Sequence, residues 1–113
     1  MPINEWSENI LIAEVNDEPA FSEDLEMLMR RVEQEEGSGH DIIVNMKPVT
    51  YVNSTNIAQL LKLRKTVIAG NRRLRICAVN NQVWSVILIT GLDKLFEFTD
   101  DVSTALASLQ LGV

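Results

Sequence analysis

The sequence predicts an α/β fold in which short buried strands alternate with amphipathic helices. Apolar, β-branched runs occur at 9–15, 41–46 and 74–79, and each is short enough to be a strand. Apolar residues at helical spacing fill the stretches between these runs, and residues that start and stop helices stand at their ends. This alternation implies parallel βαβ units on a mixed sheet, with helices covering one or both of its faces.

The first part of the chain is expected to hold three strands and one helix. The run at 9–15 is a strand bounded by polar turn residues, and Ile3–Trp6 can pair beside it. A helix is expected to open at Ser22, which would cap it, and to stop at Gly37. The run at 41–46 lacks polar alternation, which predicts a strand buried on both faces.

The rest of the chain is expected to hold three helices and two strands. In order, we expect a helix over 54–69 that ends at Gly70-Asn71, a strand over Leu74–Val79, a helix across 83–88 capped by Asn80 or Asn81, a short strand at Leu95–Phe98, and a last helix that begins near Asp100-Asp101 and stops by Gly112.

Length and composition indicate one domain over residues 1–113. A chain of 113 residues that is 46% apolar and 23% charged can bury one core and leaves little room for a second. No apolar run approaches the roughly 20 residues that a membrane span needs. The N-terminus also lacks the basic start and apolar centre of a signal peptide. We therefore expect a cytoplasmic protein without direct membrane insertion.

Composition also argues against several function classes. A net charge of -6 disfavours nucleic-acid binding, which depends on clustered Lys and Arg. The single Cys77 has no partner for an intramolecular disulfide, and with the single His40 it makes a transition-metal site implausible. We expect no metal and no cofactor.

An enzymatic role is not expected. His40 sits in a glycine-containing loop, where it is expected to face solvent, and no glycine-rich nucleophile elbow surrounds Ser54. Neither a phosphate-binding loop nor a dinucleotide-binding glycine motif follows any expected strand.

Charge is uneven along the chain. The first helical segment is acidic, whereas the stretch from Lys62 to Arg75 is basic. Solvated helix faces and complementarity to helix dipoles explain this pattern, and a partner of matching charge is the secondary interpretation.

A polar turn at 53–56 is the candidate functional site. Asn53, Ser54, Thr55 and Asn56 follow Tyr51-Val52 where a strand gives way to a helix. One such residue suffices to cap a helix, an effect worth about 1 kcal/mol, so four in a row indicate a recognition surface. A second motif, Thr90-Gly91-Leu92-Asp93-Lys94-Leu95-Phe96, lies downstream.

These two segments together resemble the STAS domain family, the bacterial anti-sigma-factor antagonists and their relatives. The resemblance spans roughly Asp41 to Leu109. It implies a single STAS-like α/β domain with a mixed sheet of about four to five strands and about four helices. The family typically carries Asp-Ser-Ser/Thr-Gly at this turn, and the first hydroxyl after the Asp is the phosphoacceptor. By position, that hydroxyl belongs to Ser54.

The sequence departs from the family pattern at the turn itself. Asn53 stands where the family usually has Asp, and Asn56 where it usually has Gly. The turn after the early strand also differs, because 16–19 read Asn-Asp-Glu-Pro in place of a Gly-Glu-Leu-Asp-like sequence. Asn56 adds a side chain where a partner's backbone would approach. Binding is therefore a safer expectation than phosphorylation.

The resemblance implies a non-catalytic regulatory domain that binds an anti-sigma factor with serine-kinase activity. Contacts are expected from Asn53, Ser54, Thr55 and Asn56, together with Asn16 and Asp17. Phosphorylation of Ser54 would end the complex, and a phosphatase would reverse it. The alternative is a constitutive STAS subunit of a stress-signalling scaffold or a lipid-transport ABC assembly, which would dock by the same face without a phosphorylation cycle.

Overall fold

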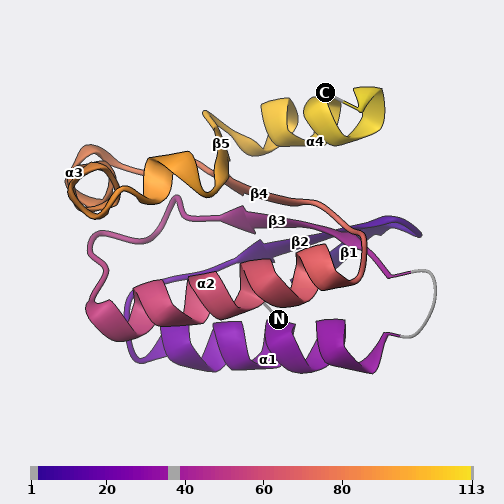
Figure 1. Cartoon of the computed structure of the whole chain (residues 1–113), viewed down its shortest axis with the longest axis horizontal. Coiled ribbons are helices and arrows are strands. Elements are labelled where there is room, and N and C mark those ends of the chain that lie inside the picture. The colour runs from indigo at the N-terminus through magenta and orange to yellow at the C-terminus, as the bar shows by residue number, and fades with distance from the viewer. Residues whose placement is uncertain (1–2, 36–38, 113) are drawn as a thin grey trace.

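The computed structural model describes residues 3–35 and 39–112, which form an α/β arrangement around one sheet (Figure 1). The elements are, in order, β1 (Ile3–Ser7), β2 (Ile10–Glu14), α1 (Ala20–Gln34), β3 (Asp41–Asn45), α2 (Ser54–Ala69), β4 (Leu74–Cys77), α3 (Asn81–Thr90), the 3-10 helix η1 (Leu92–Lys94), β5 (Glu97–Thr99) and α4 (Val102–Leu111). The sheet order is β1-β2-β3-β4-β5, with β1 antiparallel to β2 and the other pairs parallel. The expected mixed sheet with four α-helices is confirmed.

Helices cover both faces of the sheet (Figure 1). The helices α1 and α2 lie side by side on one face, where the larger core cluster includes Phe21, Leu28, Leu63 and Ile76. The helix α4 covers the opposite face, over a smaller cluster of Ile10, Ile43, Cys77, Ala105 and Leu109. Four of the five residues of β3 are buried because this strand lies mid-sheet beneath both layers.

Several expected boundaries are confirmed, and the open alternative at α3 is resolved. Asn80 caps this helix, because its side-chain oxygen accepts a hydrogen bond from Val83 N at 2.8 Å. Asp101 caps α4 in the same way through Thr104 N at 2.7 Å. Two strands differ slightly from expectation. The strand β4 ends at Cys77 because Ala78 has a left-handed backbone, with φ of 60°, and β5 begins two residues later than expected.

The expected start of α1 was wrong. The helix begins at Ala20, so Ser22 lies inside its first turn rather than at its cap. Ser22 N and Oγ both donate to the Glu18 carboxylate, each at 2.6 Å, so Glu18 supplies the acceptor at this helix end. The expected stop at Gly37 falls outside the described residues.

The expectation that His40 faces solvent was also wrong. Its side chain is 12% exposed, and Nδ1 lies 2.5 Å from Glu35 Oε1. The backbone N of His40 donates to Glu35 Oε2 at 3.0 Å, so this histidine fastens the end of α1 to the start of β3. Across residues 3–35 and 39–112, no helix has both the length and the apolar character that crossing a bilayer requires.

Candidate functional site

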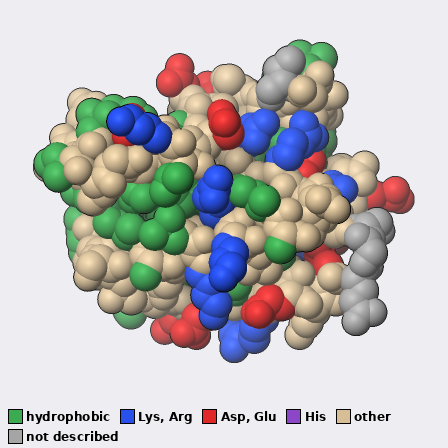
Figure 2. Space-filling model, viewed as in Figure 1, with side chains coloured by type: hydrophobic (Ala, Val, Ile, Leu, Met, Phe, Trp, Pro, Cys, Tyr) green, Lys and Arg blue, Asp and Glu red, His purple; other side chains and the backbone are tan. Residues whose placement is uncertain are grey.

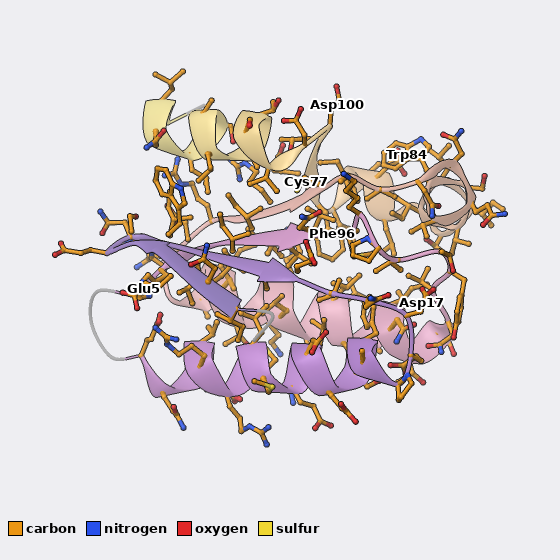
Figure 3. The ribbon with its side chains drawn as sticks, turned by 180° about the vertical axis from the view of Figure 1, so that it is seen from behind. Glu5, Asp17, Cys77, Trp84, Phe96 and Asp100 are labelled. Atoms are coloured by element: carbon orange, nitrogen blue, oxygen red, sulfur yellow. The ribbon has the colours of Figure 1, made fainter. Side chains whose placement is uncertain are left out.

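Three loops meet at the carboxyl edge of the parallel strands. They follow β2, β3 and β4, and they lead into α1, α2 and α3. Because parallel strands all point the same way, the loops after their carboxyl ends gather at one edge of the sheet. Figure 3 shows Asp17, from the first of these loops, at the same end of the sheet as Trp84 of α3, with Glu5 at the opposite end.

Asp17 joins the first loop to the second. Its carboxylate accepts hydrogen bonds from Thr50 Oγ1 at 2.6 Å and from Thr50 N at 2.8 Å. The Thr50 hydroxyl, followed by the Thr50 backbone N-H, lowers the pKa of Asp17 because both stabilise the ionised carboxylate. Asn16 is exposed, and its Oδ1 accepts from Asp17 N at 2.8 Å. Asn16 and Asp17 therefore lie in the loop that is fastened to the approach of α2.

Asn80 joins the third loop to the second. Its Nδ2 donates to Val49 O at 2.7 Å while its Oδ1 caps α3. The segment before Ser54 is thus held from both sides, by Asp17 and by Asn80. A surface that is fixed before binding loses less conformational entropy when a partner binds.

Asn53 and Asn56 form a reciprocal capping box at the start of α2. Asn56 N donates to Asn53 Oδ1 at 2.8 Å, and Asn53 N donates to Asn56 Oδ1 at 3.1 Å. The two departures from the family pattern are therefore two halves of one structural unit. A glycine at position 56 would have no side chain to accept the second bond.

The Asn56 side chain is not free to contact a partner, contrary to the expectation from the sequence. The residue is 1% exposed, and its Nδ2 donates to Gln59 Oε1 at 3.4 Å. Ser22 Oγ of α1 reaches the same Gln59 oxygen at 3.5 Å. Asn56 points inward because it satisfies backbone and side-chain partners beneath the turn, so its role is to hold the turn in place.

Ser54 and Thr55 lie exposed as the first two residues of α2. The first backbone N-H groups of a helix have no partner within the helix, and the helix dipole favours an anion near them. No acidic residue lies in the first turn of α2. A phosphate on Ser54 would therefore be accepted by the helix end without local charge repulsion.

Sequence reasoning missed Tyr51 as a surface residue. The sequence placed Tyr51 only in the stretch that leads into the polar turn, yet the residue is 50% exposed, three positions before Ser54. Tyrosine is enriched at protein interfaces because it combines large contact area with a polar hydroxyl. Its position beside the polar turn is the feature of the sequence that could have marked Tyr51 as a candidate contact residue.

The described residues do not assemble a catalytic or metal-binding site around Ser54. His40 precedes β3 and Ser54 follows the loop after it, so the strand separates them. Among residues 3–35 and 39–112, no group of three or more His, Cys, Asp or Glu side chains is placed to hold a metal ion. The arrangement offers a rigid, polar, exposed helix start, which is suited to contact with another protein.

The comparisons with known proteins agree with this geometry. The family model described as "STAS domain" matches residues 3–105. The chain belongs to the STAS domain family. STAS domains are typically non-catalytic. No curated protein sequence shows significant similarity to the chain.

Solved STAS-like structures share the fold at low identity. A putative anti-sigma factor antagonist from Thermotoga maritima has a TM-score of 0.82 at 14% identity, covering 96% of this chain and 93% of that one. The anti-sigma factor antagonist SpoIIAA in its unphosphorylated form has a TM-score of 0.78 at 15% identity, covering 98% and 96%. A sulfate transporter family protein from Wolinella succinogenes has a TM-score of 0.77 at 19% identity, covering 90% and 85%. At these identities the similarity establishes the fold.

Proposed function

We propose that this STAS domain is a non-catalytic regulatory protein that binds an anti-sigma factor with serine-kinase activity through the start of α2. The observation that carries the proposal is the pair of exposed hydroxyls, Ser54 and Thr55, at a helix start fixed by Asp17, Asn80 and the Asn53–Asn56 capping box. The structural likeness to anti-sigma factor antagonists supports it. In this role the unphosphorylated domain sequesters the kinase and frees a sigma factor.

Phosphorylation of Ser54 is the proposed switch. The phosphate adds about -1.5 to -2 charges at pH 7, which α2 tolerates at its N-terminus. A protein interface centred on the same turn does not tolerate it, because the dianion would be desolvated without matching cations. The domain therefore keeps its fold and loses its partner when Ser54 is modified, and a phosphatase restores binding. Asn53 in place of Asp removes one negative charge that would otherwise repel the phosphate.

The test is binding of the serine kinase from the same host to Ser54 variants. Ser54→Asp should weaken binding at least about tenfold, whereas Ser54→Ala should bind and accept no phosphate. Ser103→Asp is a matched control, because Ser103 is likewise exposed in the first turn of a helix, α4. Equal affinity of Ser54→Asp and the unmodified protein for the kinase would refute the switch.

A constitutive docking subunit is the second candidate. The shared fold with a sulfate transporter family protein favours it, and a stress-signalling scaffold or lipid-transport ABC assembly would use the same face. On this alternative, phosphosite mapping of the protein from its host finds Ser54 unmodified, and a permease or ATPase subunit co-purifies in place of a kinase.

A further inference from the structure

Exposed residues form one stripe along α2, starting at the proposed switch. Ser54, Leu61 and Ile68 follow one another at intervals of seven residues, and all three are exposed. Seven residues are close to two helical turns, so these side chains share one face of the helix. The stripe runs for about 21 Å from Ser54 to Ile68, at about 1.5 Å per residue. It is therefore continuous with the surface proposed to bind the kinase.

Leu95 extends the apolar part of this stripe across to η1. Arg64 Nε donates to Leu95 O at 2.8 Å, which fastens the end of η1 against α2. Leu61, Ile68 and Leu95 are 37%, 48% and 47% exposed, and we call these three residues the seam patch. Figure 2 shows apolar side chains gathered along this seam, between α2 and the α3–η1 segment, with Lys and Arg side chains beside them.

A small hollow opens at one end of the seam patch. Its volume is about 170 Å³, and its lining includes Ile68, Leu95, Arg64, Arg75 and Glu97. The hollow offers room for one aliphatic or aromatic side chain of a partner, with guanidinium groups at its rim. Large apolar residues grouped in this way, rather than scattered singly, mark an interaction surface.

The charge around the seam patch is opposite to that of the whole molecule. The segment from Lys62 to Lys94 contains seven of the ten Lys and Arg residues and one of the sixteen Asp and Glu residues, Asp93. Two of these cations, Arg72 and Arg73, pair with Asp41, and Glu97 is the acid that lines the hollow, so among the described residues the unpaired positive charge beside the patch comes mainly from α2. The helix α2 contributes Lys62, Arg64 and Lys65 and carries no acid. A protein of net charge -6 thus presents a basic border to this apolar stripe. Complementarity then requires an acidic partner surface.

We propose that the seam patch docks an acidic amphipathic helix of the partner that binds the Ser54 turn. The inference rests on the proposed function and specifies the chemistry of that partner. A helix laid along α2 brings apolar residues onto Leu61 and Ile68 every second turn and places Asp and Glu against the flanking cations. A second copy of this chain does not supply such a helix from α1, its acidic helix, because the apolar residues of α1, Phe21, Leu25 and Leu28, are already buried in the core.

A peptide probe tests the inference independently of the kinase. An 18-residue helical peptide with a leucine stripe and glutamate on its other faces is titrated into the ¹⁵N-labelled protein. The expected result is saturable shifts of the Leu61, Ile68 and Leu95 amides. A peptide of the same composition with its leucines dispersed around the helix, and one with lysine in place of glutamate, should each bind at least about tenfold more weakly. Absence of seam shifts, or equal binding of the lysine peptide, overturns the inference.

Variants separate this inference from the proposed function. Leu61→Ser with Ile68→Ser should weaken peptide binding at least about tenfold, whereas Leu111→Ser, which removes a still more exposed leucine from α4, should leave it unchanged. Ser54→Asp should weaken kinase binding at least about tenfold and retain peptide binding. Kinase binding that responds to Ser54→Asp but not to the double seam variant refutes the docking helix and leaves the switch standing. Shifts at the seam patch that are produced by anionic phosphatidylglycerol vesicles instead of the acidic peptide also overturn it, as do shifts that grow with protein concentration because the protein self-associates.

Discussion

The Asp17 carboxylate accepts two hydrogen bonds from Thr50. The two residues are 33 positions apart in the sequence, and their contact connects the loop after β2 to the loop after β3. The contact is built from a backbone N-H and a hydroxyl, so it fixes both the position of Thr50 and its rotamer. It stands at the base of the segment that carries Tyr51 and leads to Ser54. The position of Ser54, the proposed switch residue, therefore depends on the Asp17–Thr50 contact, which is present in the domain without a partner.

Removing the Thr50 hydroxyl should raise the pKa of Asp17. Thr50→Val keeps the shape and the backbone N-H, but it deletes the hydroxyl hydrogen bond, which is the largest of the causes that lower this pKa. A lowered pKa means that Asp17 stabilises the fold above its unfolded-state pKa, and this contribution disappears as pH falls through the lower folded-state value. The stability difference between the original protein and Thr50→Val should thus shrink from roughly pH 5 to pH 2. A carboxyl ¹³C titration and acid unfolding measure both effects; an unshifted Asp17 would contradict the prediction.

The capping box should behave as one energetic unit. Asn53→Ala should cost about 1 kcal/mol of unfolding free energy, as expected for a lost N-cap. Asn56→Ala should cost about 1 to 3 kcal/mol, because Asn56 is buried and its loss leaves a backbone N-H without its partner. The double variant should cost less than the sum, since each residue accepts from the other.

Urea unfolding measures the capping-box energies, with Ser54→Ala as the control. Ser54 is exposed at the next position, and its replacement should change stability by no more than about 0.5 kcal/mol. Strict additivity of Asn53→Ala and Asn56→Ala would show that the two side chains do not support each other.

Cys77 should be inert in the folded protein. It is fully buried in β4 beneath α4, and burial raises the pKa of its thiol to about 11 (Figure 3). The reactive species is the thiolate, so both access and ionisation are suppressed. A disulfide reagent at pH 8 should react with Cys77 only as fast as the protein unfolds, and immediately in concentrated urea. Fast reaction under native conditions would contradict the packing of α4 on this face.

Ala78 should tolerate glycine and reject a β-branched residue. Its φ of 60° lies in the left-handed region, which costs a non-glycine residue roughly 1 to 2 kcal/mol. Ala78→Gly removes this conformational cost, but glycine also raises the conformational entropy of the unfolded chain, which offsets about 0.4 to 1 kcal/mol of the gain in stability. The stability of Ala78→Gly should therefore equal that of the original protein or be slightly higher. Ala78→Val should destabilise the protein by more than about 1 kcal/mol. Thermal unfolding of the two variants decides this, and equal melting temperatures would argue against the left-handed backbone.

The sequence by itself determined the order and type of the elements. Apolar spacing is a local property, so the buried strand at 41–46 and the helix at 54–69 are readable from a few neighbouring residues. The same holds for caps made within four residues, such as Asn80 on α3 and Asp101 on α4. The exposed polar turn at Ser54 follows from both, because a loop after a buried strand precedes a capped helix.

Only the tertiary structure decided which polar side chains form hydrogen bonds within the protein and are therefore not available to a partner. Asn56 was expected at the surface, yet partners from its own turn, and Gln59 below it, draw its side chain inward. At the start of α1, Glu18 rather than Ser22 is the hydrogen-bond acceptor. Thr50, in the loop after β3, donates to Asp17 in the loop after β2. Such pairings depend on how parallel strands bring distant loops to one sheet edge. Hydrogen bonds need a partner within about 3 Å, and sequence spacing does not specify that distance once the partners lie on different elements.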